Sequence, residues 1–349
     1  MTSIILLALA ALASYLISQI VCKYGKKLQI LDDPKSHKHP KVVHTTTVPR
    51  GGGIPISLTV IFLLALFGGL NQQTLGIIAG ITILAVTGYI DDRFEEKFSP
   101  YFRLVLNIVA ACCVVFSGIS IWYITNPFGG VIHFDFWVSA GLAIFWLVWM
   151  QNIVGWSSGV DGQLPGFVII AALTMALLGT RFGEGQNQNL MLILALATAG
   201  AYLGFLPWNW FPQKMLPGYG GKSLAGFLLG TLAILSSAKV GAMLLVLGIP
   251  VLDAVRVIIK RISEGRSPVW GGREHFHHYL LDLGWGKRRI AVFYWVVSGI
   301  LAILSLYLNS GAKYFTMAGG ALLFFGLFAW WNYWSISQKP RVRGSGSKT

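Results

Sequence analysis

The sequence predicts an all-α integral membrane protein with about eleven transmembrane helices, its amino end outside the cell and its carboxyl end cytoplasmic. Two observations predict this fold class. Hydrophobic residues make up 55% of the 349 positions and charged residues only 11%, whereas a soluble domain carries about 25% charged residues. The mean hydropathy is +0.65, and apolar residues gather in stretches of roughly the 17–25 residues that a spanning helix needs. Lipid must therefore cover most of the surface.

Eleven apolar stretches are expected to cross the membrane. In chain order they are 3–21, 54–70, 74–90, 102–120, 136–154, 164–180, 188–206, 224–239, 240–259, 289–308 and 314–335. The first stretch has no basic residue before it and lysines directly after it, which is the reverse of a cleaved signal peptide, so we expect an uncleaved helix. Residues 1–338 are expected to form one polytopic membrane domain. Residues 339–349 are expected to be a cytoplasmic tail that ends in an expression scar.

The distribution of charge supports this topology. The expected cytoplasmic segments are 22–53, 91–101, 155–163, 207–223, 260–288 and the tail after 335. Of 27 basic residues, 24 fall in these segments or at the adjoining helix ends, as the positive-inside rule requires. Eleven of 13 acidic residues and six of seven histidines fall there too, which orientation does not require. This concentration of polar groups predicts a cytoplasmic active site.

The net charge of +14 narrows the choice of partners. On a soluble protein it would suggest nucleic acid. On a membrane protein whose basic residues face one side, it indicates an anionic leaflet and anionic substrates instead. We therefore expect membrane lipid as a partner and no nucleic acid.

The first cytoplasmic segment carries basic side chains and a glycine run. Lys38 and Arg50 lie in it, and Gly51-Gly52-Gly53 opens the second predicted helix. Free N–H groups at a helix start favour an anion, so this segment is typical of a phosphate site at the membrane surface. The competing interpretation is a solvated basic loop.

The third predicted helix ends in two adjacent carboxylates, Asp91 and Asp92. Carboxylates near lipid are costly unless they meet a cation, and oxygen ligands of this kind suit Mg²⁺. A polar helix end facing water is the alternative. Arg103 and Asn107 follow four positions apart on the next helix and therefore share a face, which we expect to point toward the same site.

Two glycine-rich cytoplasmic segments follow. The first runs from Asn152 to Gly162 and contains one carboxylate, Asp161, which taken alone would more often be a turn residue. The second, 207–223, contains Asn209, Lys214 and Lys222. Its Gly-Lys-Ser ending lacks the first glycine of a P-loop, which excludes an NTPase of that class, but glycines and a lysine at a helix start still suit a phosphate.

The last cytoplasmic segment contains Arg273, His275, His277 and His278. No cysteine accompanies the three histidines, and their spacing is not that of a usual structural zinc site. Beside basic residues, binding of phosphate or handling of protons is the favoured interpretation, and a purely structural cluster is the alternative.

Taken together, these motifs resemble the polyprenyl-phosphate N-acetylhexosamine-1-phosphate transferase family, glycosyltransferase family 4. The ordered matches are Asp33-Pro34 through Pro49-Arg50-Gly51-Gly52, Asp91-Asp92, Asn152 through Asp161-Gly162, Asn209 with Pro212, Asp253 after Pro250, and Ser267-Pro268 followed by His275, His277 and His278. The resemblance implies an integral membrane enzyme with ten or eleven helices at the inner (plasma) membrane. It implies transfer of a sugar-1-phosphate from a UDP-sugar to an undecaprenyl-type polyprenyl phosphate, with release of UMP, as the first step of a lipid-linked glycan pathway.

The resemblance also implies roles for single residues. Asp91, Asp92 and Asp161 are expected to be metal ligands for Mg²⁺, with Mn²⁺ as an alternative, and His277 and His278 are expected to join them as catalytic residues. The expected substrate-binding residues are Lys38, Arg50, Arg103, Asn152, Asn209, Lys214, Lys222, Arg273 and His275. Family members also suggest a homodimer.

Within the family, Pro-Arg-Gly-Gly at 49–52 and the His-x-His-His order at 275–278 resemble the N-acetylglucosamine branch. The alternative donor is UDP-MurNAc-pentapeptide. Three positions depart from the family pattern. Gly155 stands in place of an Asn, Ser158 in place of an Asp, and Tyr219 in place of an Asp that is a metal ligand. The metal site must therefore rest on the remaining aspartates, be built differently, or be lost.

Two further classes of function compete with an active transferase. A transporter or lipid flippase needs ionisable residues near the middle of its helices, and the predicted helix centres here are nearly free of charge. A catalytically impaired relative that binds polyprenyl phosphate agrees with the missing carboxylates.

Overall fold

The computed structural model describes residues 2–34, 46–94, 99–126, 128–182, 187–236, 239–267 and 272–337. Helices account for most of them, which confirms the predicted all-α membrane class in outline. The helices are α1 (Thr2–Tyr24), α2 (Gly53–Phe67), α3 (Gln72–Arg93), α4 (Pro100–Val115), α5 (Phe136–Trp156), α6 (Gln163–Phe182), α7 (Gln188–Asn209), α8 (Gly218–Leu235), α9 (Val240–Val246), α10 (Gly248–Ser263), α11 (Phe276–Asp282), α12 (Lys287–Tyr307) and α13 (Ser310–Ser337).

Each of the eleven apolar stretches coincides with a helix or with the pair α9–α10. In the described part of the chain, seven helices are long and apolar enough to cross a membrane, or eight if the bent pair counts as one span. The chain is therefore a multi-pass membrane protein. The number of eleven crossings, the orientation of the ends and the inner-membrane location stay predictions.

The stretch 240–259 is not the single straight span that the sequence predicts. It forms α9 and α10, whose axes differ by 87°. Pro250 lies in the first turn of α10, where its missing N–H needs no helical partner, so the chain starts a new helix after Leu247. α10 also carries Arg256, Lys260 and Arg261, and such side chains oppose burial of the whole helix in lipid.

Helix α8 lies in the middle of the bundle. Sixteen of its 18 residues are buried, and only Tyr219 and Lys222 retain exposed surface. Its first turns approach α2 and α3 at glycines. A Cβ at Gly88 would lie 2.3 Å from the Gly220 Cα, and one at Gly53 would lie 2.9 Å from the same atom. Small residues of this kind let helix backbones approach closely in membranes, and here they fix the start of α8 beside the end of α3.

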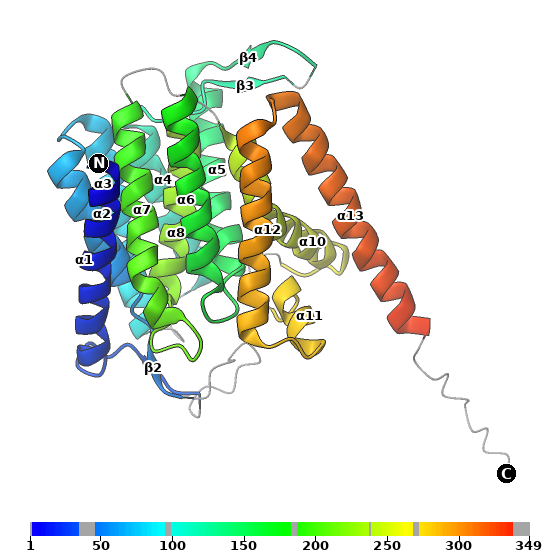
Figure 1. Ribbon diagram of the computed structural model, residues 1–349, viewed down its shortest axis with the longest axis horizontal. Helices are drawn as coiled ribbons and strands as arrows, with labels where there is room; N and C mark the ends of the chain where they lie inside the picture. Colours follow the sequence, from blue (N-terminus) through cyan, green and yellow to red (C-terminus); the bar gives the residue numbers. More distant parts are fainter. Residues whose placement is uncertain are drawn as a thin grey trace.

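Two short hairpins mark opposite ends of the bundle (Figure 1). Strands β3 (Tyr123–Thr125) and β4 (Val131–His133) form the hairpin at one end, and β1 (Leu31–Asp32) and β2 (Val48–Pro49) lie at the other end together with α11. Helix α13 stands at an angle to the main bundle in the same view. The end with β2 and α11 is where the polar motifs gather, as the sequence predicts.

Candidate functional site

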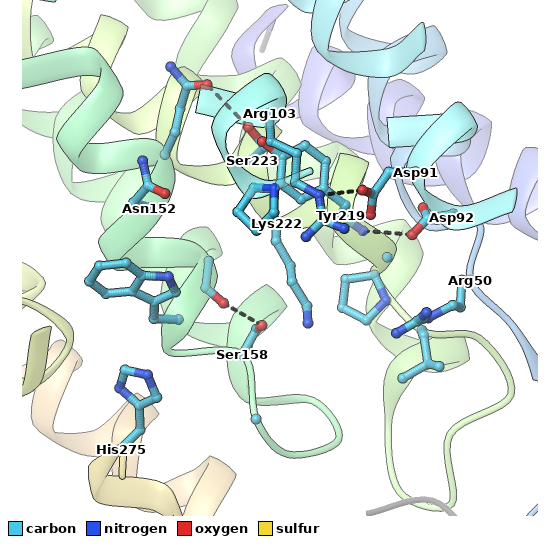
Figure 2. A pocket seen from close by; sticks show the side chains of 18 of the residues that line it. Arg50, Asp91, Asp92, Arg103, Asn152, Ser158, Tyr219, Lys222, Ser223 and His275 are labelled. Carbon is cyan, nitrogen blue, oxygen red and sulfur yellow. Dashed lines mark hydrogen bonds and ion pairs between the residues drawn. The ribbon is translucent and has the colours of Figure 1, made fainter. Parts of the chain in front are cut away.

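A cavity of about 600 Å³ opens at the end of the bundle that carries β2 and α11. Its walls come from the carboxyl ends of α3 and α5, the starts of α4 and α8, the segment between α5 and α6, and α11. Figure 2 shows side chains from these elements pointing toward one another. Eleven predicted site residues line it: Arg50, Asp91, Asp92, Arg103, Asn152, Asp161, Asn209, Lys222, His275, His277 and His278.

Asp92 anchors the start of α8. Its Oδ1 accepts a hydrogen bond from the Tyr219 backbone N–H at 2.8 Å, and a helix start favours a carboxylate in this way. Gly218 makes the contact possible, because it adopts φ +65° and a Cβ there would lie 2.1 Å from the Asp92 Oδ2. Asp92 therefore couples the end of α3 to the helix that carries Tyr219 and Lys222.

Asp91 and Arg103 form an ion pair between α3 and α4. The Asp91 side chain is buried and that of Arg103 is mostly so. The guanidinium of Arg103 also lies 5.2 Å from the centre of the Tyr219 ring, a distance at which cation–π attraction operates. Arg103 is thus held at the cavity wall from two sides.

A polar network next to this ion pair joins α4, α5 and α8. The Tyr219 hydroxyl donates to the Asn107 Oδ1 at 2.9 Å, and the Ser223 hydroxyl lies 3.3 Å from the same oxygen and 3.1 Å from the Gln151 Oε1. Asn107, Gln151 and Ser223 are buried, and buried polar groups that satisfy one another fix a single arrangement. Asn107 and Arg103 line the same cavity.

Arg50 is held at the rim by the chain on both sides of it. Its backbone N–H donates to the Ile30 carbonyl at 2.7 Å, and it pairs with Leu216 in an isolated bridge. Its Nε lies 3.2 Å from an oxygen of the buried Asp32. The adjacent glycine run serves packing, because the Gly52 N–H donates to the Leu216 carbonyl at 3.1 Å and Gly53 packs against α8. Gly52 and Gly53 thus contact other parts of the chain, and the phosphate site expected at this glycine run stays a prediction.

Asp161 is buried and paired. Its Oδ1 lies 3.3 Å from the Lys287 Nζ at the start of α12, and its Oδ2 accepts the Gln213 N–H at 3.3 Å. Asn209 supports the same loop by accepting the Gly162 N–H at 3.1 Å and donating to the Met215 carbonyl at 3.0 Å. These bonds tie the segments 157–162 and 210–217 into one wall of the cavity.

The three histidines form a compact cluster at the start of α11. The rings of His277 and His278 have centroids 4.1 Å apart, and His275 stacks on His277 at 5.8 Å. Asp253 on α10 positions the cluster, since its carboxylate lies 2.9 Å from the His275 Nδ1 and accepts the Phe276 N–H at 2.9 Å. His277 packs against Gly159, where a Cβ would lie 1.7 Å from the His277 Nε2.

Burial and neighbouring positive groups keep two of these histidines neutral. Burial, followed by the charge of His275, lowers the pKa of His278 to about 4. Burial, followed by the charge of His278, lowers the pKa of His277 well below its usual value. Their Nδ1 atoms are buried and have no hydrogen-bond partner among the described residues. Each neutral ring can therefore donate one N–H and accept one hydrogen bond at the cavity.

The described carboxylates do not fit the predicted Mg²⁺ site. Mg²⁺ binds through one or two carboxylates together with substrate phosphates, but Asp91 is paired with Arg103 and Asp161 with Lys287. Asp92 accepts the N–H at the start of α8. No group of three or more His, Cys, Asp or Glu side chains in the described ranges is placed to hold a metal ion. The use of Mg²⁺ or Mn²⁺ stays a prediction.

Two predicted binding residues are not part of the cavity wall, and a third lies outside the described residues. Lys38 lies outside the described residues. Arg273 is exposed and forms an ion pair with Asp282 at 2.6 Å, and Lys214 lies over the Trp208 ring at 5.8 Å. Neither of these two lines the cavity. The sequence of a basic loop does not indicate the direction in which a lysine or arginine side chain points.

Several residues of the site were not assigned roles from the sequence. Asp32 pairs with Arg50, Lys287 pairs with Asp161, and Gln151 joins the buried network. The pair formed by Lys287 and Asp161 joins positions 126 residues apart, so no local pattern could have revealed it. Asp253 belongs to one of the sequence motifs, but no sequence pattern indicates its contact with His275.

Comparison with known proteins agrees with the resemblance. Residues 74–237 match the family model described as Glycosyl transferase family 4. A probable undecaprenyl-phosphate N-acetylglucosaminyl 1-phosphate transferase of Bacillus subtilis is 26% identical over 86% of this chain and 84% of its own. A decaprenyl-phosphate N-acetylglucosaminephosphotransferase of Mycolicibacterium smegmatis is 27% identical over 85% and 80%. A phospho-N-acetylmuramoyl-pentapeptide-transferase of Bacillus licheniformis is 28% identical over 82% and 90%. The predicted resemblance is confirmed.

Proposed function

Since residues 74–237 match glycosyl transferase family 4, we propose that this chain transfers a sugar-1-phosphate from a UDP-sugar to a polyprenyl phosphate and releases UMP. The donor is UDP-GlcNAc, the acceptor is of the undecaprenyl type, and the reaction takes place at the cytoplasmic face of the inner membrane. Two relatives whose names state an N-acetylglucosamine transfer support this choice of donor. A homodimer stays a prediction.

One observation carries the proposal. Arg50, Arg103 and Lys222 come from three separate elements and line the same cavity at the end of a membrane bundle. The substrates bring phosphate groups from two directions, one with a lipid and one with a soluble nucleotide. A cavity that is open to the bundle end and lined by cationic side chains suits both of them.

The chemistry needs positioning more than proton transfer. An oxygen of the polyprenyl phosphate attacks the sugar-linked phosphorus, and a new P–O bond forms. The bond from that phosphorus to the bridging oxygen breaks, and its electron pair leaves with UMP. Because the attacking oxygen is already ionised at pH 7, no strong base is required, and the obstacle is the repulsion between two anions.

The site residues reduce that obstacle in two ways. Arg50 and Arg103 present planar guanidinium groups that bind phosphate oxygens in pairs, and their ion pairs with Asp32 and Asp91 keep them in place. The neutral rings of His277 and His278 offer N–H donors from the opposite wall without adding charge. Holding both phosphates in line supplies a large share of the rate in reactions of this type.

The test is release of UMP by the purified full chain in detergent. The protein is incubated with UDP-GlcNAc, undecaprenyl phosphate and Mg²⁺, beside Asp92→Asn and the exposed-residue control Lys26→Gln. UMP that depends on the lipid is expected from the wild type and the control. The Asp92→Asn rate is expected to be lower by at least about 10-fold, because one charge-assisted hydrogen bond is worth about 1.5–3 kcal/mol.

The outcomes separate the parts of the proposal. A parallel reaction with UDP-MurNAc-pentapeptide tests the alternative donor, which the relative from Bacillus licheniformis suggests. Lack of UMP from every UDP-sugar would refute the transferase and leave a lipid-binding relative. Unchanged activity of Asp92→Asn would refute only the role of Asp92.

A further inference from the structure

One lysine, Lys222, lies in the wall of the cavity. Gly155, Ser158 and Tyr219 line the same cavity as Lys222, although they come from α5, the segment after it and α8. A Cβ at Gly155 would lie 3.5 Å from the Lys222 Cβ. Apart from its chain neighbours and the backbone of its own helix, no other atom lies within 4 Å of that Cβ. A side chain at 155 would therefore occupy the space beside the lysine.

The geometry of α8 directs this lysine into the cavity. Tyr219 and Lys222 are three positions apart, so they share one face of the helix, and they are the two residues of α8 that are not buried. Figure 2 shows the Lys222 side chain extending from α8 into the space that the labelled residues surround. The hydroxyl of Tyr219 is bonded to Asn107, which holds this face of α8 toward the cavity.

The charge of Lys222 acts on both walls of the site. It interacts with Asp91 and Asp92 at the end of α3, and with His277 on α11 across the cavity. Because Lys222 lines the same cavity as these groups, a diphosphate bound between the two walls would lie within reach of its ammonium group. Lysine is well suited to such a place, since its three N–H donors turn on a flexible stem and bind phosphate as a point charge.

We propose that Lys222 is the cation that binds the diphosphate of the nucleotide substrate and that transfer proceeds without a divalent metal ion. This rests on the proposed function. The carboxylates that a metal would need are engaged by Arg103, Lys287 and the start of α8. As the bond to the bridging oxygen breaks, the ammonium group stabilises the charge that develops on the departing UMP, and no proton needs to move.

The first arm of the test measures lipid-dependent UMP release by the purified full chain in excess EDTA and in Mg²⁺. The wild-type rate is expected to change less than about threefold between the two. Lys222→Gln is expected to lose about 100-fold or more in both, the size of effect seen when one preorganised charge-stabilising group is removed. Lys222→Arg should retain part of the rate, and Lys26→Gln all of it. A wild-type rate that falls about 100-fold in EDTA would overturn the proposal.

The second arm distinguishes failure of this proposal from failure of the transferase. Binding of UDP is measured by titration calorimetry in EDTA, and it needs no turnover. The wild type and Lys26→Gln are expected to bind equally, and Lys222→Gln about 10-fold or more weakly. A protein that releases no UMP but shows this pattern refutes the transferase and keeps the role of Lys222. Absence of UDP binding in EDTA, or equal binding by Lys222→Gln, overturns the proposal whatever the activity.

Discussion

Replacing Asp253 with alanine tests whether α10 positions the histidine cluster. The carboxylate is 1% exposed, and its oxygens lie 2.9 Å from the His275 Nδ1, 2.9 Å from the Phe276 N and 2.8 Å from an Arg256 nitrogen. The substitution removes all three contacts and leaves the Arg256 charge in a mostly buried place. Removal of one partner of a buried ion pair costs about 3–5 kcal/mol.

The assay is thermal unfolding of the purified protein in one detergent, followed by intrinsic fluorescence. At about 2–4 °C for each kcal/mol in a chain of 150–250 residues, and somewhat less for a longer one, we expect the apparent Tm to fall by roughly 5–15 °C. Lipid-dependent UMP release should also fall, because His277 and His278 lose their support.

A matched control exists on the same segment. Asp282 forms an ion pair with Arg273 at 2.6 Å, but both side chains are exposed, and pairs of this kind contribute about 0–1 kcal/mol. Asp282→Ala should therefore shift the Tm by less than about 3 °C. Equal shifts for Asp253→Ala and Asp282→Ala would refute the argument that the buried carboxylate holds α11.

Three other predictions follow from single contacts. Burial lowers the pKa of His278 to about 4, below the pKa of about 6.5 in the unfolded chain, so stability is lost as pH falls from about 6.5 to 4, by about 3 kcal/mol. His278→Gln should therefore flatten the dependence of the Tm on pH across this range. An unchanged slope would contradict the assignment. The Cβ of Gly88→Ala would lie 2.3 Å from an α8 backbone atom, so this variant should be destabilised by ~1–3 kcal/mol of overpacking and melt at a lower Tm. The control Gly299→Ala, whose Cβ meets no atom within 4 Å, should keep the wild-type Tm, and equal Tm values for the two variants would contradict the close packing. Lys287→Met should lower the Tm, and adding Asp161→Asn should recover part of the loss; additive losses would show that the pair does not interact.

The sequence alone located the helices because lipid imposes a long apolar run on each crossing. It failed at 240–259, where the apolar run continues through the break at Leu247, between the end of α9 and the start of α10. Hydropathy depends on composition and not on the direction of the helix axis, so it does not reveal the 87° bend within an apolar run. Pro250 and the basic residues of α10 were the available signals.

The candidate site was predicted in part for a similar reason. Motif residues such as Asp92 and His277 lie at helix ends that topology brings to one face, and the structure brings them to one cavity. The pairs that position them, such as Lys287 with Asp161, join distant parts of the chain. The glycines at 52 and 53 show the same difficulty. A glycine run indicates that another group approaches the backbone closely, but it does not identify that group as α8.

Transfer of doubly labelled donor tests the central claim most directly. UDP-GlcNAc carrying ³²P in the phosphate next to the sugar and ³H in the sugar is incubated with the protein and undecaprenyl phosphate, and the lipid is extracted. A sugar-1-phosphate transferase is expected to move both labels into the lipid in equal amounts and to release unlabelled UMP. Tritium in the lipid without ³²P, or both labels only in free GlcNAc-1-phosphate, would contradict the proposed reaction.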